Sequence, residues 1–287
     1  MARGAHRAAS SRVPYGLGSG EARGKQMDLG LSDKVILVTG GSSGIGRATA
    51  TRLAADGARV AICARGAERL EATARALRAE HQADVLAVTA DVGTAAGVER
   101  FVGAALDRFG AIHGLVNNAG GSAAGPFAAI DDADWQADLD LKLFSMIRMI
   151  RLCLPQLIAN KGAVVNVAAI SGQQPGARSM PSSVTRAAGL ALTKALSKEY
   201  APEGVRVNAV CIGVVRSGQQ EKHWQQHAPH LALEEFYVEW ARQRGVPLGR
   251  VGYPEEVAAL IALLLSGQGA FITGTAINVD GGMSAVL

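Results

Sequence analysis

The chain has 287 residues, of which 48% are hydrophobic and 19% are charged, enough apolar material for one large buried core. Its formal net charge of +4 lies entirely in the first 26 residues, which contain five Arg or Lys and a single Glu. The remainder holds 24 basic and 24 acidic residues, and such a neutral body argues against a nucleic-acid surface.

The segment before Met27 reads MARGAHRAASSRVPYGLGSGEARGKQ. An Arg-rich, Ser-containing, acid-poor composition is typical of a transit peptide, and it equally fits an extension ahead of a translation start at Met27. Both readings stay open. We expect a basic, disordered tail over residues 1–26 and one domain over residues 27–287.

The cysteines indicate neither a disulfide framework nor a metal site, because Cys63, Cys153 and Cys211 are odd in number, far apart and outside any CxxC motif. We expect all three to be reduced and buried. The longest apolar run near the C-terminus, VAALIALLL, has 9 residues and is short of the roughly 20 that cross a bilayer. We therefore expect a cytoplasmic protein with no membrane span.

Short β-branched apolar runs alternate with helical stretches from Lys34 onward. Runs that are apolar throughout are typical of strands covered on both faces. Between two of them, Leu70, Ala74 and Leu77 form one apolar stripe at helical spacing. This alternation predicts an α/β fold with a parallel, doubly wound sheet, in which ligands bind at the carboxyl ends of the strands. The expected strands are residues 34–38, 59–63, 85–89, 112–116, 163–167, 205–210 and 276–279.

The sequence VTGGSSGIGRATA follows the first expected strand and opens the first expected helix. Gly40, Gly44 and Gly46 give a GxxxGxG spacing, in which glycines permit a tight turn and the helix N-terminus receives a pyrophosphate. A plain loop is the alternative, but its position between strand and helix argues against it.

The end of the second expected strand bears on the choice of cofactor. An acid there would bind a free ribose hydroxyl and repel a 2′-phosphate, but Ala64 and Arg65 occupy the position. A guanidinium without an acid favours NADP(H) over NAD(H), unless Arg65 is merely solvated. After the third strand, Asp91 could accept from the adenine amino group or instead cap the next helix.

Five motifs together resemble the classical short-chain dehydrogenase/reductase family. They are TGGSSGIG (39–46), NNAG (117–120), VVNVAAISG (164–172), RVNAV (206–210) and TGTAINVDGG (273–282). The resemblance implies a single Rossmann-type sheet of about seven strands, a homo-oligomer (a tetramer or a dimer), and hydride transfer between a nicotinamide and a carbonyl or alcohol. The cofactor-binding positions that we expect are Gly40, Ser42, Ser43, Gly44, Ile45, Gly46, Arg65, Asp91, Val92, Asn117, Ala119, Gly120, Arg186, Gly213, Val215 and Ser217.

The family's catalytic residues are missing from the positions that the motifs assign to them. Its tyrosine position is Ser182, its lysine position is Arg186, its serine position is Ala169 and its asparagine position is Lys142. Ser182 is a weaker acid and shorter than tyrosine, and Ala169 offers no hydrogen-bond donor. We place Ser182 and Arg186 at a helix start and on its exposed side.

Two features could rescue the chemistry. Lys142 could replace the missing ammonium, or else be a surface or salt-bridged residue. Ser171 and Ser183 could supply a hydroxyl, or else serve a turn and a cap.

The segment from about 215 to 247 occupies the place of the family's substrate loop. Its aromatic residues could form the wall of a pocket for an apolar small molecule, or could pack a helix pair or a subunit contact; they are Trp224, Phe236, Tyr237 and Trp240.

Three functional readings follow. The residues favour an NADP(H)-binding protein that is catalytically silenced or strongly impaired. The alternatives are an NADP-dependent oxidoreductase with a rearranged site and a non-redox enzyme that reuses the pocket.

Overall fold

The computed structural model describes residues 27–286, so the tail expected over residues 1–26 lies outside the described residues. Within the described part a 7-stranded parallel sheet runs in the order β3-β2-β1-β4-β5-β6-β7, which confirms the predicted fold class. The strands are β1 (Val35–Thr39), β2 (Arg59–Ala64), β3 (Val85–Thr89), β4 (Gly114–Asn117), β5 (Ala163–Ala169), β6 (Arg206–Ile212) and β7 (Ala276–Val279).

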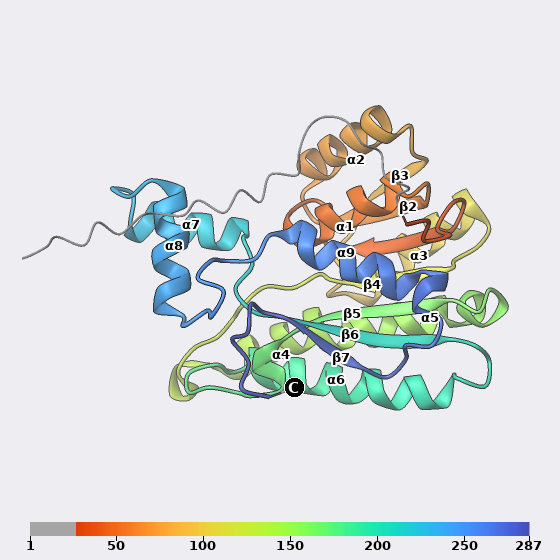
Figure 1. Ribbon diagram of the computed structural model, residues 1–287. Helices are drawn as coiled ribbons and strands as arrows, with labels where there is room; N and C mark the ends of the chain where they lie inside the picture. The colour runs from red at the N-terminus through yellow and green to blue at the C-terminus, as the bar shows by residue number, and fades with distance from the viewer. Residues whose placement is uncertain (1–26, 287) are drawn as a thin grey trace, which may run out of the picture.

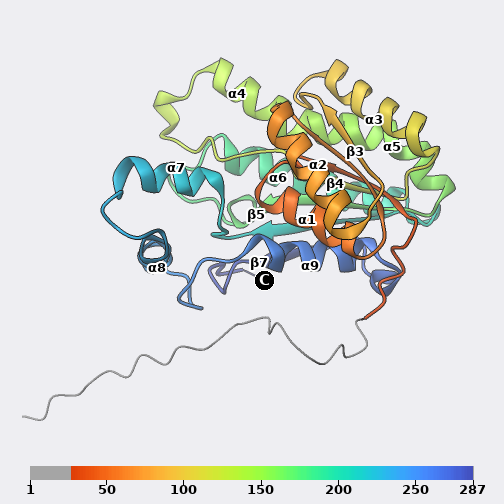
Figure 2. The same ribbon diagram turned by 90° about the horizontal axis from the view of Figure 1, so that it is seen from above.

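Helices cover both faces of this sheet (Figures 1 and 2). The helices are α1 (Gly44–Ala55), α2 (Ala67–His81), α3 (Ala95–Phe109), α4 (Asp132–Leu139), α5 (Ser145–Ala159), α6 (Ser182–Glu199), α7 (Gly218–His227), α8 (Leu233–Gln243) and α9 (Pro254–Leu265). None of the described helices is long and apolar enough to cross a membrane.

Alternate residues of each strand point to opposite layers of the core. In β1, Ile36 and Val38 pack with α1, α2 and α9, whereas Val35 and Leu37 pack with α3 and α5. Because both faces are buried, the strands read as continuous apolar runs, which is why the sequence predicts them well.

The expected stripe of α2 is confirmed, because Leu70, Ala74 and Leu77 are all buried. Cys63, Cys153 and Cys211 are also free and buried, as expected.

Five of the seven strands differ from the predicted ranges by one or two residues at an end, and β5 and β6 differ most at their carboxyl ends. β5 and β6 continue to Ala169 and Ile212, two residues past the predicted ends, because the two strands stay paired up to that point. This extension carries Ala169 to the carboxyl edge of the sheet, where α7 and α8 project beyond the strands (Figure 1).

Candidate active site at the carboxyl edge

The backbone of the glycine-rich turn requires its glycines. Gly40 and Gly44 have positive φ angles of 70° and 52°, and a Cβ on Gly46 would lie 2.2 Å from the Gly40 carbonyl oxygen. The side chain of Ser43 precedes α1 without capping it, which leaves backbone N–H groups of the first turn for an anion. Ser42 and Ile45 lie in the same turn.

The adenosine end of the expected cofactor site is formed by the ends of β2 and β3. Arg65 follows β2 and is exposed, with no acid beside it in the sequence. Asp91 is exposed and accepts a hydrogen bond from the Gly93 amide at 3.0 Å. The alternative that Asp91 caps the next helix is wrong, because Thr94 is the N-cap of α3 and accepts from the Gly97 amide.

The NNAG segment is fixed beside the glycine-rich turn. The Thr39 hydroxyl accepts from the Asn118 and Ala119 amides, both at 3.0 Å. The Asn117 amide group donates to Asn166 at 2.9 Å, and both side chains are buried. These bonds hold the backbone of Ala119 and Gly120 at the edge where β1 and β4 end.

The last expected cofactor residues follow β6. Gly213 is needed for packing, because a Cβ there would lie 2.7 Å from the Cβ of Asp280. Val215 is buried and pairs with Gly252. The Ser217 side chain accepts from the Gln220 amide and so caps α7.

Lys142 is buried and lies in a π-helical turn, η2 (Asp140–Phe144), between α4 and α5. Its Nζ donates to the Asp138 carboxylate and to Ser182 Oγ, the latter at 2.8 Å. We expected Lys142 either to replace the missing ammonium or to be salt-bridged. The structure shows both contacts, because the ammonium is salt-bridged to Asp138 and also contacts Ser182 at the tyrosine position. Such π turns occur frequently at functional sites.

Ser182 is the first residue of α6, but it does not lie on the exposed side that we expected. Only 8% of it is accessible, because its side chain points inward to Lys142 and to the loop after β4. Ser182 Oγ accepts from Lys142 Nζ and from the Ala123 amide at 2.9 Å. Two accepted bonds use both lone pairs, so the hydroxyl proton remains to be donated to another group.

Two residues of this cluster were missed in the sequence analysis. Asp138, buried near the end of α4, accepts from the Thr185 hydroxyl at 2.7 Å as well as from Lys142. The available signal was the four-residue step from Asp138 to Lys142, which places the two side chains on one face of a helix. Thr185 gave no signal, since its role depends on how α6 packs against α4.

Arg186 also turns inward, contrary to the exposed side that we expected. Its Nη1 donates to the Val167 carbonyl at 2.5 Å, and its Nη2 lies 3.2 Å from the position of a Cβ on Gly120. Ala169 ends β5 and has no polar side-chain atom. The Arg186 guanidinium therefore binds a carbonyl near the carboxyl end of β5. The Lys142 ammonium is the cation that contacts Ser182.

Burial and neighbouring charges set the ionisation of the two cations. Burial lowers the pKa of the Lys142 ammonium, the hydrogen bond and charge of Asp138 oppose that shift, and the charge of Arg186 adds to it. Burial likewise lowers the pKa of Arg186, and the negative charge of Asp138 opposes that change.

The two other candidate hydroxyls have different local surroundings. Ser183 Oγ accepts from the Ser179 hydroxyl at 3.0 Å, and Ser171 lies in a short 3₁₀ turn, Ile170–Gly172. Ser171 therefore lies in a turn, as expected, whereas Ser183 does not cap α6, whose N-cap is Pro181.

The aromatic residues of the substrate-loop segment pack against one another. Phe236 lies 5.4 Å from Trp240 between ring centroids, and Trp224 donates its indole N–H to the Leu231 carbonyl at 3.0 Å. These contacts support the helix-pair alternative. The first helix of the pair also reaches the site, because the Gln219 amide group exchanges two hydrogen bonds with the backbone of Ser122.

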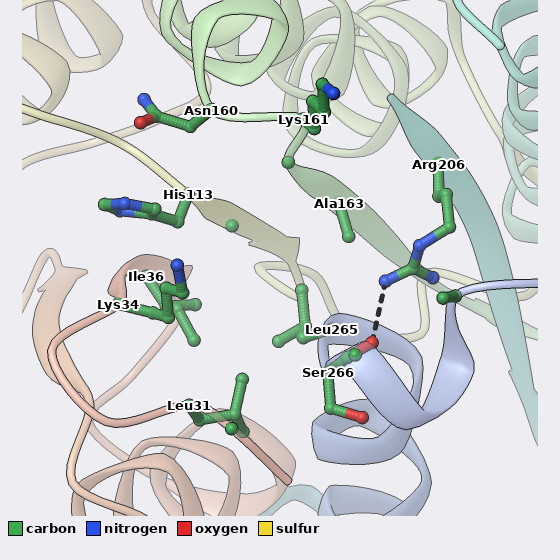
Figure 3. Close-up of a pocket in the computed structure, with 15 residues that line it drawn as sticks. Leu31, Lys34, Ile36, His113, Asn160, Lys161, Ala163, Arg206, Leu265 and Ser266 are labelled. Carbon is green, nitrogen blue, oxygen red and sulfur yellow. Dashed lines mark hydrogen bonds between the residues drawn. The ribbon is translucent and has the colours of Figure 1, made fainter. Parts of the chain in front are cut away.

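A cavity of about 240 Å³ lies at the opposite, amino edge of the sheet (Figure 3). Lys34, His113 and Arg206 contribute to its wall. The Arg206 guanidinium donates to the Ser266 carbonyl at 3.1 Å and to the Leu264 carbonyl at 2.6 Å, so it stabilises the C-terminal end of α9. Because ligands of parallel α/β sheets bind at the carboxyl ends of the strands, this cavity is not the candidate active site.

Known proteins resemble the chain over most of its length. The family described as enoyl-(acyl carrier protein) reductase matches residues 40–284. A putative ketoacyl reductase of the monensin polyketide synthase from Streptomyces virginiae is 41% identical over 258 residues, covering 88% of this chain and 97% of that protein.

Two solved structures share the fold and contain NADPH. A short-chain oxidoreductase from Pseudomonas aeruginosa, described as containing an atypical catalytic center, is 39% identical with a TM-score of 0.84, covering 89% of this chain and 100% of that one. L-Sorbose reductase from Gluconobacter frateurii, in complex with NADPH and L-sorbose, is 32% identical with a TM-score of 0.86. The match covers 91% of this chain and 100% of that one.

Proposed function

Because the chain belongs to the short-chain dehydrogenase/reductase family, we propose that it is an NADP(H)-dependent oxidoreductase acting on a carbonyl or alcohol through a rearranged catalytic centre. The observation that carries this proposal is the 2.8 Å hydrogen bond from Lys142 Nζ to Ser182 Oγ. In this bond an ammonium from the family's asparagine position, Lys142, contacts a hydroxyl at the family's tyrosine position, Ser182.

The preference for NADP(H) rests on the residues at the ends of β1 and β2. The turn around Gly46 admits a pyrophosphate, and Arg65 can bind a 2′-phosphate that an acid would repel. The NADPH complexes of the Pseudomonas and Gluconobacter proteins support this choice.

When bound, the cofactor supplies or accepts the hydride. In the reduction, Ser182 donates its hydroxyl proton to the substrate oxygen, since both of its lone pairs accept bonds from Lys142 and Ala123. Lys142 then returns a proton to the serine oxygen and is itself reprotonated from solvent. The reaction is expected to be slow, because a serine hydroxyl is a weak acid and Ala169 adds no second donor.

A silenced NADP(H)-binding protein is the second candidate. It is favoured by the absence of a polar side chain at Ala169 and by the inward position of Ser182. The Lys142–Ser182 contact, together with a relative described as having an atypical catalytic center, leads us to prefer the rearranged centre.

The biological setting belongs to the same proposal. We propose a cytoplasmic homo-oligomer, a tetramer or a dimer, with residues 1–26 as a tail outside the catalytic domain. Light scattering of the purified full chain tests the assembly, and fluorescence microscopy of the tagged full chain tests the location.

Steady-state oxidation of NADPH by the full chain tests the proposed activity. Because relatives are a putative ketoacyl reductase and an L-sorbose reductase, the panel contains 3-oxoacyl thioesters and keto sugars. Ser182→Ala and Lys142→Met should each lower kcat/KM by about 10²- to 10⁴-fold. Ser183→Ala and Lys198→Met are the matched controls and should retain activity.

Two outcomes would contradict the proposal. One is NADPH binding without turnover of any panel member, which supports the silenced reading. The other is turnover that survives the loss of both Ser182 and Lys142.

A further inference from the structure

The buried carboxylate of Asp138 has a role that the proposed chemistry does not yet include. We propose that Asp138 is a positioning residue that holds Lys142 protonated and directed at Ser182 Oγ, with Thr185 fixing the carboxylate. This inference rests on the proposed function, because it assigns the residue that keeps the Lys142–Ser182 pair ready for proton transfer.

The geometry uses both carboxylate oxygens. Oδ1 accepts from Lys142 Nζ, and Oδ2 accepts from the Thr185 hydroxyl at 2.7 Å. Only 5% of Asp138 and 4% of Lys142 are accessible, so water cannot replace either partner easily. The carboxylate is thus fixed by Lys142 of η2 on one side and by Thr185 of α6 on the other.

Thr185 links this carboxylate to the backbone of the residue that carries the reactive hydroxyl. It follows Ser182 by one turn of α6, and its Oγ1 also lies 3.0 Å from the Ser182 carbonyl oxygen. A shift of Asp138 would therefore change the direction of the Lys142 ammonium relative to the helix that carries Ser182.

The charges that face Lys142 explain why it needs a counterion. Arg186 of α6 is a second cation close enough to disfavour the ammonium, and burial disfavours it further. Asp138 is the charged group that opposes both effects. Since the reduction needs a proton on Lys142 to restore the Ser182 hydroxyl, Asp138 should set the upper limit of the active pH range.

The first measurement does not require turnover. The chain is labelled with ¹⁵N at lysine Nζ, and the Lys142 resonance is assigned by its loss in Lys142→Met. Asp138→Asn is nearly isosteric and should move the Lys142 titration midpoint to lower pH, because the carboxylate that favours the ammonium is lost. Asp140→Asn is the matched control, because that carboxylate binds Arg148 and Gln136.

The second measurement is the pH profile of kcat/KM for NADPH-dependent reduction. The alkaline limb should shift to lower pH in Asp138→Asn and follow the midpoint seen by NMR. Thr185→Val keeps the charge but frees the carboxylate, so it should lower kcat with a smaller shift of the limb. A purely structural role of Asp138 would lower the rate at every pH without moving the limb.

The outcomes separate the two proposals. An unchanged Lys142 midpoint in Asp138→Asn would overturn the role of Asp138 even if the wild-type enzyme is active. A shifted midpoint in a protein without turnover would confirm the electrostatic role of Asp138 and reject the catalytic function.

Discussion

Gly46 provides the sharpest test of the cofactor-binding turn. In Gly46→Ala the new Cβ would lie 2.2 Å from the Gly40 carbonyl oxygen and 2.5 Å from Asn118 Nδ2. Real contacts of this kind exceed 3.0 Å, so the turn must open. Overpacking of a fixed backbone costs about 1 to 3 kcal/mol. We therefore expect a lower free energy of unfolding and a large loss of NADPH affinity.

The matched control is Gly103→Ala in α3, where a new Cβ has no atom within 4 Å. Because alanine is a better helix former, this variant should gain about 0.5 to 1 kcal/mol. Urea unfolding measures the free energies, and isothermal titration calorimetry measures NADPH binding. The reasoning is refuted if Gly46→Ala matches Gly103→Ala in stability, or if it binds NADPH like the wild type.

Three further predictions concern charge and ionisation. Arg65→Asp should weaken NADPH binding about tenfold or more, because a charge-assisted bond to phosphate is worth about 1.5 to 3 kcal/mol, while NADH binding in the same calorimetric assay should be retained. Arg216 holds the pKa of Glu234 below its usual value through a hydrogen bond. That contribution to stability is present above the unfolded pKa of about 4.3 and is lost as pH falls through the lower folded value, so urea unfolding curves of the wild type and Glu234→Gln should converge in acid. Burial raises the pKa of Cys63 and Cys153 to about 12 and that of Cys211 to about 11, so a thiol reagent at pH 8 should react with these groups only after unfolding.

The sequence predicts the fold well because its signals are local. Each strand of the buried sheet is a short apolar run, and the glycines of the first turn are required by backbone geometry at adjacent positions. The strand ends cannot be predicted in the same way, because the pairing of Ala169 with Ile212 joins two segments far apart in the chain.

The candidate centre could be predicted only in part. The motifs assign the positions of Lys142 and Ser182, but these residues are separated by 40 positions and meet through tertiary packing. The π turn that directs Lys142 has no distinctive residue pattern. Asp138 is one of several acids in the stretch DDADWQADLD, and only packing against α6 distinguishes it from a solvated residue.

The arrangement of charges explains how the centre tolerates two cations. Lys142 and Arg186 lie in one buried region, and the charge of each disfavours further positive charge nearby. Arg186 is held by the Val167 carbonyl, whereas Lys142 is held by Asp138, so the two cations bind different partners. The three groups together keep one positive charge in excess, which can stabilise an alkoxide that develops on Ser182 or on a substrate. Removal of Asp138 would leave two cations without a counterion, and Lys142 would lose its proton more readily than Arg186 because an amine is the weaker base.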